Sequence, residues 1–570
     1  MKNNSRFGFR FAHANMWYLT LVALATVAVT NLLKLAALVR LEIAIALALF
    51  VLLTGFITFR SRTLFGWIAR RWGRRPMRER IFLYEYGGVG ISWDGQRAAA
   101  YIEVLPKPYE ITTISTSGAQ GLRSLPIDDI RQELQQFDIR CEAVTIVNFG
   151  YKYAQPSKLA TTYHHTLGPV PALLYGRTFV EVAINLSDSL ESVYRRRLDD
   201  DTPAGLSRTV TLATERIRRR ITRKGWTAKP LSKVEVKRLT TQLSTDLLTP
   251  LRNEHWASAG QKSMRAIAYT PTASAWTTAR YRDWCRLNTH RQVQILRLDR
   301  RRMGDHAELY IGYLNGDTKP LETVSALGLR REYSQQGDIL TAALPTARTD
   351  RTSAVQGMNL AGKEFPIEIH PCGAGTFVGY TKNSGEQVFV NFTVGATKRG
   401  SLNRIEFDPF YIVAPAAMCQ QILLRLATSG RTIDISLPGE PWSQFAASIN
   451  AGHHNSPDKE IKSAADIIVV PADKIPLPHH PGQVCIVWTT TDPKELTPAQ
   501  QMNYGIVADR GESTVQAGEE RARFQWTVTS TEEAYFTLRP RQATRPPQSS
   551  PEPPPGGRLA TGHGLGHHHR

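Results

Sequence analysis

Two apolar runs near the amino terminus constrain this chain more than any other feature. Residues 17–33 and 43–59 are almost wholly apolar, and the short stretch between them contains Lys34, Arg40 and Glu42. As helices, both runs with their apolar flanks are long enough to cross a hydrocarbon core of about 30 Å. The sequence therefore predicts a helical hairpin in a membrane, with spans at about 16–38 and 41–59.

Cations beside the runs predict how the hairpin is oriented. Lys2, Arg6 and Arg10 precede the first run, and the stretch 60–80 is rich in arginine and opposed there only by Glu79. Basic residues next to a span are retained in the cytoplasm. We therefore expect residues 1–15 and the carboxyl terminus both to be cytoplasmic. A cleaved signal peptide does not fit, because a second apolar run follows directly.

We predict that the segment 60–80 is a basic juxtamembrane anchor, because its tryptophans are interleaved with arginines that can face anionic lipid. The alternative is that these arginines serve only as the signal that sets the orientation of the hairpin. The lipid-facing basic residues are Arg70, Arg71, Arg74 and Arg75. Within the hairpin, small residues permit close approach of partner helices. The predicted helix contacts are Trp17, Ala23, Ala25, Ala28, Ala44, Ala46 and Ala48.

Composition narrows the function classes. A net charge of +20 would suggest nucleic acid in a soluble protein, but part of the excess lies beside the membrane segment and no nucleic-acid-binding motif accompanies the rest. We therefore expect no nucleic-acid partner. The five cysteines are far apart and form no C-x-x-C pair, which favours isolated thiols in a reducing cytoplasm.

Beyond the anchor, apolar patterning predicts an α/β (mixed α+β) cytoplasmic region of two domains, 81–340 and 341–540, followed by a disordered Pro/Gly/His-rich tail at 541–570. Apolar periodicity predicts helices at 125–137, 206–224 and 416–427. Strands are expected at 81–86, 98–105, 143–149, 179–186, 308–314, 365–370, 387–392, 432–436, 466–470, 484–489 and 523–528.

Few residues suggest chemistry. Asp199 and Asp201 form a D-x-D pattern, which holds a divalent metal and a nucleotide sugar in many glycosyltransferases, although an exposed charged turn explains the same residues. No phosphate-binding loop, histidine ligand spacing or nucleophile elbow is present. We therefore expect no cofactor and no enzyme, with a membrane-anchored glycosyltransferase-like protein as the alternative.

The stretch 84–95, continuing to 99–104, resembles the EccE family, a membrane component of the type VII (ESX) secretion systems of mycobacteria and related actinobacteria. The motif residues are Gly87, Gly88, Gly90, Trp93, Asp94 and Gly95. The resemblance implies a structural subunit of an inner-membrane core complex that supports protein export driven by a separate ATPase. It implies partners resembling EccB, EccC and EccD, most directly EccD and EccC, together with the mycosin protease.

Overall fold

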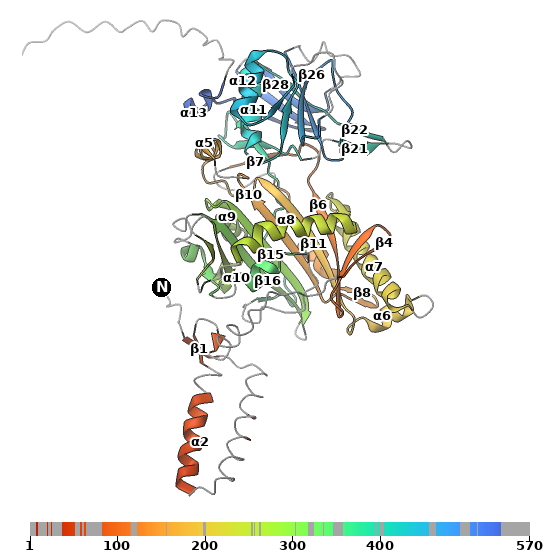
Figure 1. The fold of residues 1–570 in the computed structure, drawn as a ribbon, viewed down its shortest axis with the longest axis vertical. Helices are drawn as coiled ribbons and strands as arrows, with labels where there is room; N and C mark the ends of the chain where they lie inside the picture. Colours follow the sequence, from red (N-terminus) through yellow and green to blue (C-terminus); the bar gives the residue numbers. More distant parts are fainter. Residues whose placement is uncertain are drawn as a thin grey trace, which may run out of the picture.

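The computed structural model describes residues 82–536 with short gaps, together with 7–9, 20, 24, 37–51, 57–59 and 62–63. The gaps are 116–121, 155–156, 198–200, 252–254, 256, 262–263, 302–303, 317–323, 334–335, 346–356, 394–395, 400–403, 455–462, 491–501 and 510. The chain is a mixed α/β protein with several sheets, as predicted. Figure 1 shows a larger and a smaller sheet-based body stacked along the long axis, with helix α2 (Ala37–Val51) standing apart at one end.

The amino-terminal region differs from the predicted hairpin where it is described. Helix α2 runs through the predicted break at 39–40, because no glycine or proline interrupts residues 37–51. The predicted second span is wrong at its end: β2 (Ile57–Phe59) is a strand that pairs with β1 (Phe7–Phe9) and with β3 (Arg62–Thr63). Aromatic and β-branched residues favour that strand. Within the described residues, no helix is long and apolar enough to span a bilayer.

Most of the predicted first span and of the segment 60–80, and all of the tail 541–570, lie outside the described residues.

The larger body is built on a twelve-stranded antiparallel sheet with the path β13-β14-β16-β15-β10-β11-β6-β5-β4. Three short strands extend it, since β12 pairs with β6, β17 with β14 and β18 with β16. The strands are β4 (Phe82–Tyr86), β5 (Val89–Trp93), β6 (Arg97–Leu105), β10 (Ala143–Tyr151), β11 (Tyr175–Asn185), β12 (Thr227–Pro230), β13 (Ala259–Gln261), β14 (Met264–Pro271), β15 (Arg291–Arg301), β16 (Gly304–Asn315), β17 (Leu329–Arg331) and β18 (Met358–Asn359).

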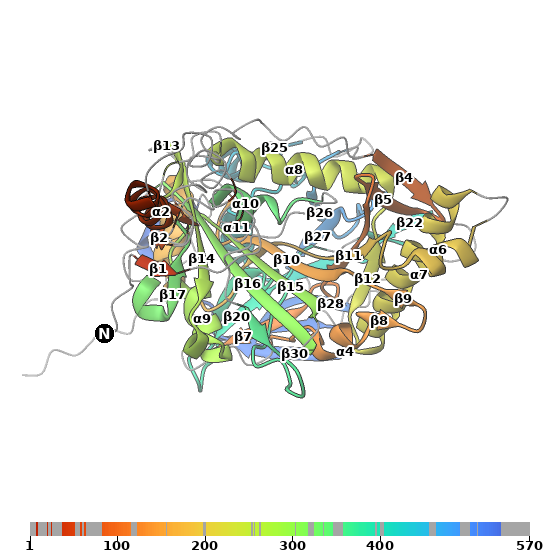
Figure 2. The ribbon, with the colours of Figure 1, turned by 90° about the horizontal axis from the view of Figure 1, so that it is seen from below.

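Helices cover both faces of this sheet. One face packs on α4 (Ile127–Gln132), α7 (Thr202–Arg223) and α9 (Thr278–Arg286), and the other on α8 (Lys233–Leu251) and α10 (Gln336–Thr341). Seen from below in Figure 2, α8 lies along one side of the strands, and α4 and α9 lie on the other. Two further pieces, α6 (Leu190–Arg195) and the hairpin β8 (Gln135–Gln136) and β9 (Ile139–Arg140), lie beside α7.

The sequence of β6 explains this arrangement. Ala98, Ala100 and Ile102 pack in the core beneath α7, whereas Ala99 and Tyr101 pack in the core beneath α8. Successive side chains of a strand point to opposite faces, so a continuous run of small and apolar residues lets helices approach on both sides. Helix α7 contributes a stripe at 3.6-residue spacing, and Asp201 caps its amino terminus, where Oδ1 accepts a hydrogen bond from the Ala204 amide at 3.2 Å.

The smaller body holds an eight-stranded sheet with the order β25-β24-β26-β27-β23-β28-β29-β30, parallel except at its last two strands. Helices α11 (Ala416–Ala427) and α12 (Glu440–Ser448) pack in its main core. The strands are β23 (Phe410–Val413), β24 (Ile433–Ile435), β25 (Gly452–His453), β26 (Ile467–Pro471), β27 (Val484–Thr489), β28 (Tyr504–Asp509), β29 (Glu512–Ala517) and β30 (Glu520–Phe524). A separate hairpin joins β21 (Ala396–Arg399) and β22 (Arg404–Phe407).

A three-stranded sheet joins the two bodies. Strand β20 (Gln387–Val390) lies in the middle and pairs with β19 (Thr376–Tyr380) on one side and with β7 (Ile111–Ile114), from the first half of the chain, on the other. Helix α5 (Lys158–Leu167), also from the first half, packs against this sheet. In Figure 1, β7 and α5 lie between the bodies. Segments of the first half therefore complete the core of the second.

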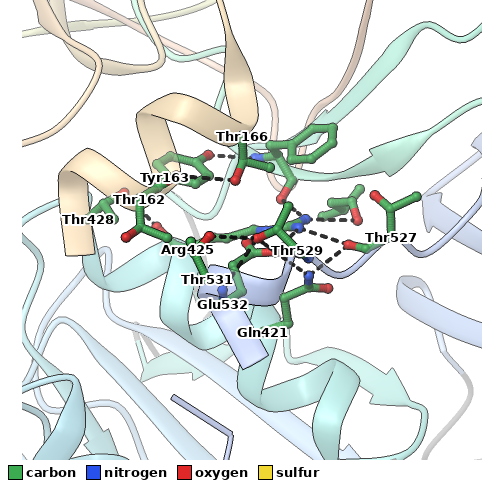
Figure 3. A network of polar contacts seen from close by, with 12 residues as sticks. Thr162, Tyr163, Thr166, Gln421, Arg425, Thr428, Thr527, Thr529, Thr531 and Glu532 are labelled. Atoms are coloured by element: carbon green, nitrogen blue, oxygen red, sulfur yellow. Dashed lines mark hydrogen bonds and ion pairs between the residues drawn. The ribbon is translucent and has the colours of Figure 1, made fainter. Parts of the chain in front are cut away.

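A buried ion pair fixes α11 beside this junction (Figure 3). Arg425 Nε donates to Glu532 Oε1 at 2.8 Å, and both side chains are almost fully buried. The guanidinium also donates to the Thr527 carbonyl at 3.1 Å and lies 4.7 Å from the centre of the Phe377 ring. Glu532 belongs to the short helix α13 (Ser530–Glu533), so one arginine holds α11, α13 and β19 together.

Several predicted elements of the two bodies differ from the structure, including the strand expected at 523–528, which ends at Phe524 in β30. The helix expected at 125–137 ends at Gln132, and residues 135–140 form the β8–β9 hairpin. The segment 365–370 is not a strand, although Phe365, Ile367 and Ile369 are buried as its alternation suggested. Its backbone bonds go elsewhere: the Phe365 amide donates to the Asp128 carboxylate at 3.1 Å. This segment packs in the larger core, and the division of the chain near residue 341 remains a proposal.

Candidate interaction surface

Exposed apolar side chains gather at one corner of the larger body. Beyond the amino-terminal segment, nine large apolar side chains among the described residues are more than a third exposed, and six of them lie around α6 and α7. Isolated exposed apolar residues are ordinary, whereas a contiguous group marks a contact surface. We name these six the apolar corner: Phe82, Tyr84 and Tyr86 of β4, Phe137 of the β8–β9 turn, and Leu190 and Tyr194 of α6.

Two arginines of α7, and Arg197 just after α6, lie over the rings of this corner. Arg208 Nε donates to the Tyr86 hydroxyl at 3.1 Å. Stacking of a guanidinium on an aromatic face is favourable by about 0.5–1 kcal/mol at exposed sites and limits the freedom of both groups. The distances from guanidinium carbon to ring centre are 5.8 Å for Arg208 and Tyr86, 5.0 Å for Arg216 and Phe137, and 4.6 Å for Arg197 and Tyr194.

Phe137 is held in an unusual position. Its side chain is 89 % exposed and its φ is +53°, a backbone region that side chains other than glycine rarely adopt. The next residue, Asp138, accepts hydrogen bonds from Arg196 at 2.6 and 3.0 Å, which lower the pKa of its carboxyl to about 2. The hairpin is thus tied to α6 while its phenylalanine faces solvent.

Helix α7 carries its own ion pairs. Glu215 accepts hydrogen bonds from Arg218, at 2.6 Å to each carboxylate oxygen, and from Arg219 at 2.9 Å, and these bonds lower its pKa to about 2. Arg220 reaches across to Glu133 at 2.6 Å. The arginines expected on the outer face of the 206–224 helix are therefore partly neutralised and held in fixed positions.

A cavity of about 360 Å³ opens between β4, α6 and α7. The hydroxyl of Thr211 is buried and has no hydrogen-bond partner among the described residues. This atom lies below the surface, so the polar groups that face the cavity are those of the arginines that line it. The lining residues are Tyr86, Arg196, Arg208, Thr211, Leu212 and Glu215.

The family-motif residues build the hairpin that presents β4. Gly87 and Gly88 form its two-residue turn with φ of +58° and +77°, which favours glycine. Gly90 lies under the loop before α8, where a Cβ atom would be 2.7 Å from the Lys233 amide nitrogen. Asp94 Oδ1 accepts hydrogen bonds from the amides of Gln96 and Arg97 at 2.9 and 2.7 Å. Trp93 is half-buried at the end of β5, and Gly95 has a φ of +103°. The motif residues therefore set the backbone conformation of this hairpin and of the turn that follows it.

The D-x-D pattern gains no support as a metal site. Asp201 caps α7, and Asp199 lies outside the described residues. No group of three or more His, Cys, Asp or Glu side chains within the described ranges could hold a metal ion.

The predicted membrane contacts are only partly described. Ala44, Ala46 and Ala48 lie on α2. Trp17, Ala23, Ala25, Ala28, Arg70, Arg71, Arg74 and Arg75 lie outside the described residues. Their roles stay predictions.

Comparison with known proteins shows a family similarity over part of the chain. A family model described as "Putative type VII ESX secretion system translocon, EccE" matches residues 175–270, which include α6, α7 and α8. The ESX-1 secretion system protein EccE1 of Mycolicibacterium smegmatis is 25% identical over 291 residues, covering 48% of this chain and 59% of that protein. Part of this chain, residues 175–270, is therefore similar to the EccE family.

EccE1 of Mycobacterium tuberculosis is 27% identical over 194 residues, covering 32% of this chain and 41% of that protein. The chain thus spans about half the length of the curated relatives it matches. The matched segment includes Leu190 and Tyr194 of α6 and the three arginines that lie over rings of the apolar corner.

The sequence reasoning missed the apolar corner. The signal for β4 was present, since aromatic residues alternate at Phe82, Tyr84 and Tyr86 and so share one side of the strand. Phe137 carried no such signal, because residues 125–137 fit a helical period that would have buried it.

Proposed function

We propose that this chain is a non-catalytic scaffold subunit of the inner-membrane core complex of a type VII secretion system, where it supports export driven by a separate ATPase subunit. The observation that carries the proposal is the family match over 175–270, supported by the distant EccE1 relatives, which are named as ESX-1 secretion system proteins.

The surface around α7 supports a contact role. Its rings are exposed, its arginines are held by Asp138 and Glu215, and its backbone is fixed by the sheet beneath. Surfaces with rigid aromatic and arginine side chains are typical of protein interfaces. A scaffold needs such prearranged contacts, because ordering flexible side chains on binding costs free energy.

We further propose that the amino-terminal 63 residues attach the chain to the inner membrane, with the two sheet-based bodies in the cytoplasm. Helix α2 consists mainly of apolar residues, and several of its large side chains are exposed, including Ile45, Leu49 and Phe50. Such a surface in water is unfavourable, and lipid or partner helices would cover it. The proposed partners are subunits resembling EccB, EccC and EccD, the mycosin protease and anionic lipid.

Purification of the full chain from its native membrane in mild detergent tests the role. We expect secretion subunits resembling EccC and EccD to co-purify in fixed ratio. Purification without any of them would overturn the proposal. Replacing both Ala25 and Ala28 by Leu is expected to weaken that association, because larger side chains keep helices apart. Unchanged recovery of the complex would rule out these alanines as helix contacts.

A further inference from the structure

We propose that the open edge of β4 binds an extended, acidic segment of a partner protein, which pairs with β4 as an added strand and places a side chain in the cavity beside Arg208. This inference rests on the proposed function, since a subunit of a secretion complex has protein neighbours, and it specifies where and how one of them binds.

The backbone of β4 is available on its outer side. Among the described strands, β4 pairs only with β5, and it ends the path of the large sheet. Figure 1 shows it at the rim of the larger body, near α6 and α7. Strand edges display unpaired amide and carbonyl groups, and proteins usually protect them with charges, bulges or prolines. In β4, aromatic residues occupy three of the five positions and only Glu85 is charged.

The register shows which peptide groups face outward. Glu85 lies opposite Gly90, and the Gly90 amide donates to the Leu231 carbonyl at 2.7 Å, away from β4. In an antiparallel pair, residues opposite each other either exchange hydrogen bonds or both point away. The amide and carbonyl of Glu85, and by the same alternation those of Leu83, therefore point to the open edge.

The charged side chains on the two faces of the sheet beside β4 determine which charge an added strand should carry. Arg208 lines the cavity on the α7 side, where the other charged lining residues already have partners: Arg196 is paired with Asp138, and Glu215 with Arg218 and Arg219. On the other side, Lys233 and Lys237 of α8 are exposed and take part in no ion pair among the described residues. Basic groups on both faces favour acidic side chains in the incoming strand.

The cavity beside β4 suits one side chain of that strand. Its volume of about 360 Å³ exceeds that of any single side chain, and Tyr86 and Leu212 supply apolar contact. The guanidinium of Arg208, which also lines the cavity, offers hydrogen-bond donors. Side chains of an added strand alternate, so one apolar residue with a polar tip can enter the cavity while its neighbours meet the lysines. A tyrosine beside acidic residues fits this description best.

Photo-crosslinking within the assembled complex tests the inference. A benzophenone amino acid replaces Tyr84 in the full chain, and the same replacement at Leu477, 78 % exposed and outside the apolar corner, serves as the control. We expect Tyr84 to crosslink to one partner subunit, at a segment containing Asp or Glu, and Leu477 not to reach that segment. Crosslinks to lipid alone, or none in an intact complex, would overturn the inference and leave the proposed function standing.

Paired variants separate the backbone contact from the side chain. Glu85→Pro and Glu85→Ala both remove the carboxylate, but only the proline removes the outward amide. We expect the Tyr84 crosslink to fall about tenfold further in Glu85→Pro than in Glu85→Ala, as for one lost backbone hydrogen bond. Equal yields would refute strand addition. Arg208→Glu should lower the yield, whereas the exposed Arg223→Glu on the same helix should not.

Failure of the wild-type chain to co-purify with any secretion subunit would instead overturn the proposed function, and this inference with it.

Discussion

Lys152 offers the sharpest quantitative test of the fold. It lies at the end of β10 with its side chain buried, 2% exposed, and its ammonium donates to the Arg286 carbonyl at 3.1 Å. Burial lowers the pKa of Lys152 to about 8, from an ordinary 10.5. At pH 7 the charged form is therefore held in an unfavourable place, and one pKa unit corresponds to about 1.4 kcal/mol.

The magnitude follows from that shift. A difference of about 2.5 units costs the folded state about 3 kcal/mol at neutral pH. Lys152→Met removes the charge at similar length but loses the hydrogen bond to Arg286, which contributes about 1 kcal/mol. We therefore expect Lys152→Met to raise the free energy of unfolding by about 2 kcal/mol at pH 7.

The stability of the wild-type protein should rise with pH between 8 and 10.5. Below pH 8 the lysine is charged in both states and the cost is fully present. Between pH 8 and 10.5 the unfolded chain still binds the proton while the folded chain has lost it, so the stability of the wild type rises toward that of Lys152→Met. Above pH 10.5 the burial penalty disappears.

Urea unfolding of the purified full chain in mild detergent, at pH 7, 9 and 10.5, measures both effects. The exposed Lys158→Met on α5 is the matched control and should change little at any pH. A destabilised Lys152→Met at pH 7, or a difference from wild type that stays constant from pH 7 to 10.5, would refute the reasoning.

Three further predictions use the same unfolding assay. Arg425→Met should lower the free energy of unfolding by about 3–5 kcal/mol by leaving Glu532 buried without its partner, and adding Glu532→Leu should recover much of the loss; additive losses would contradict this. Gly90→Ala should cost about 1–3 kcal/mol through backbone contact, and full stability would argue against the close approach. Burial lowers the pKa of His164 and of His290 from 6.5 to about 4, so stability should be lost as pH falls from 6.5 toward 4, and replacing both by Gln should reduce that loss.

Local patterns predicted the parts of the fold that local physics decides. Helix 416–427 and strand 484–489 agree with α11 and β27 residue for residue, because apolar periodicity and length together allow one choice there. Strand β5 was missed, since Gly87–Gly90 and Asp94–Gly95 indicated turns and left few residues between them. Its pairing with β4 and β6 depends on contacts between segments, which local sequence patterns do not show.

The candidate surface was harder to predict than the core. The arginines of the 206–224 helix were visible in the sequence, but their partners Glu133 and Asp138 come from a hairpin that the helical period concealed. The cavity depends on β4, α6 and α7 meeting, and no spacing within one segment encodes that meeting. The sequence shows the separate helices and strands of such a site, but not how they come together.

The shared sheet between the bodies sets an order for biosynthesis. Strand β7 is made early, yet its partner β20 leaves the ribosome after more than 270 further residues. At translation speeds of 5–20 residues per second, β7 waits roughly 15–55 s without its partner. Until then the emerging chain holds an unpaired strand and an unfilled core around Tyr163 and Leu167. The core at the junction is therefore completed only after the second half of the chain has been made.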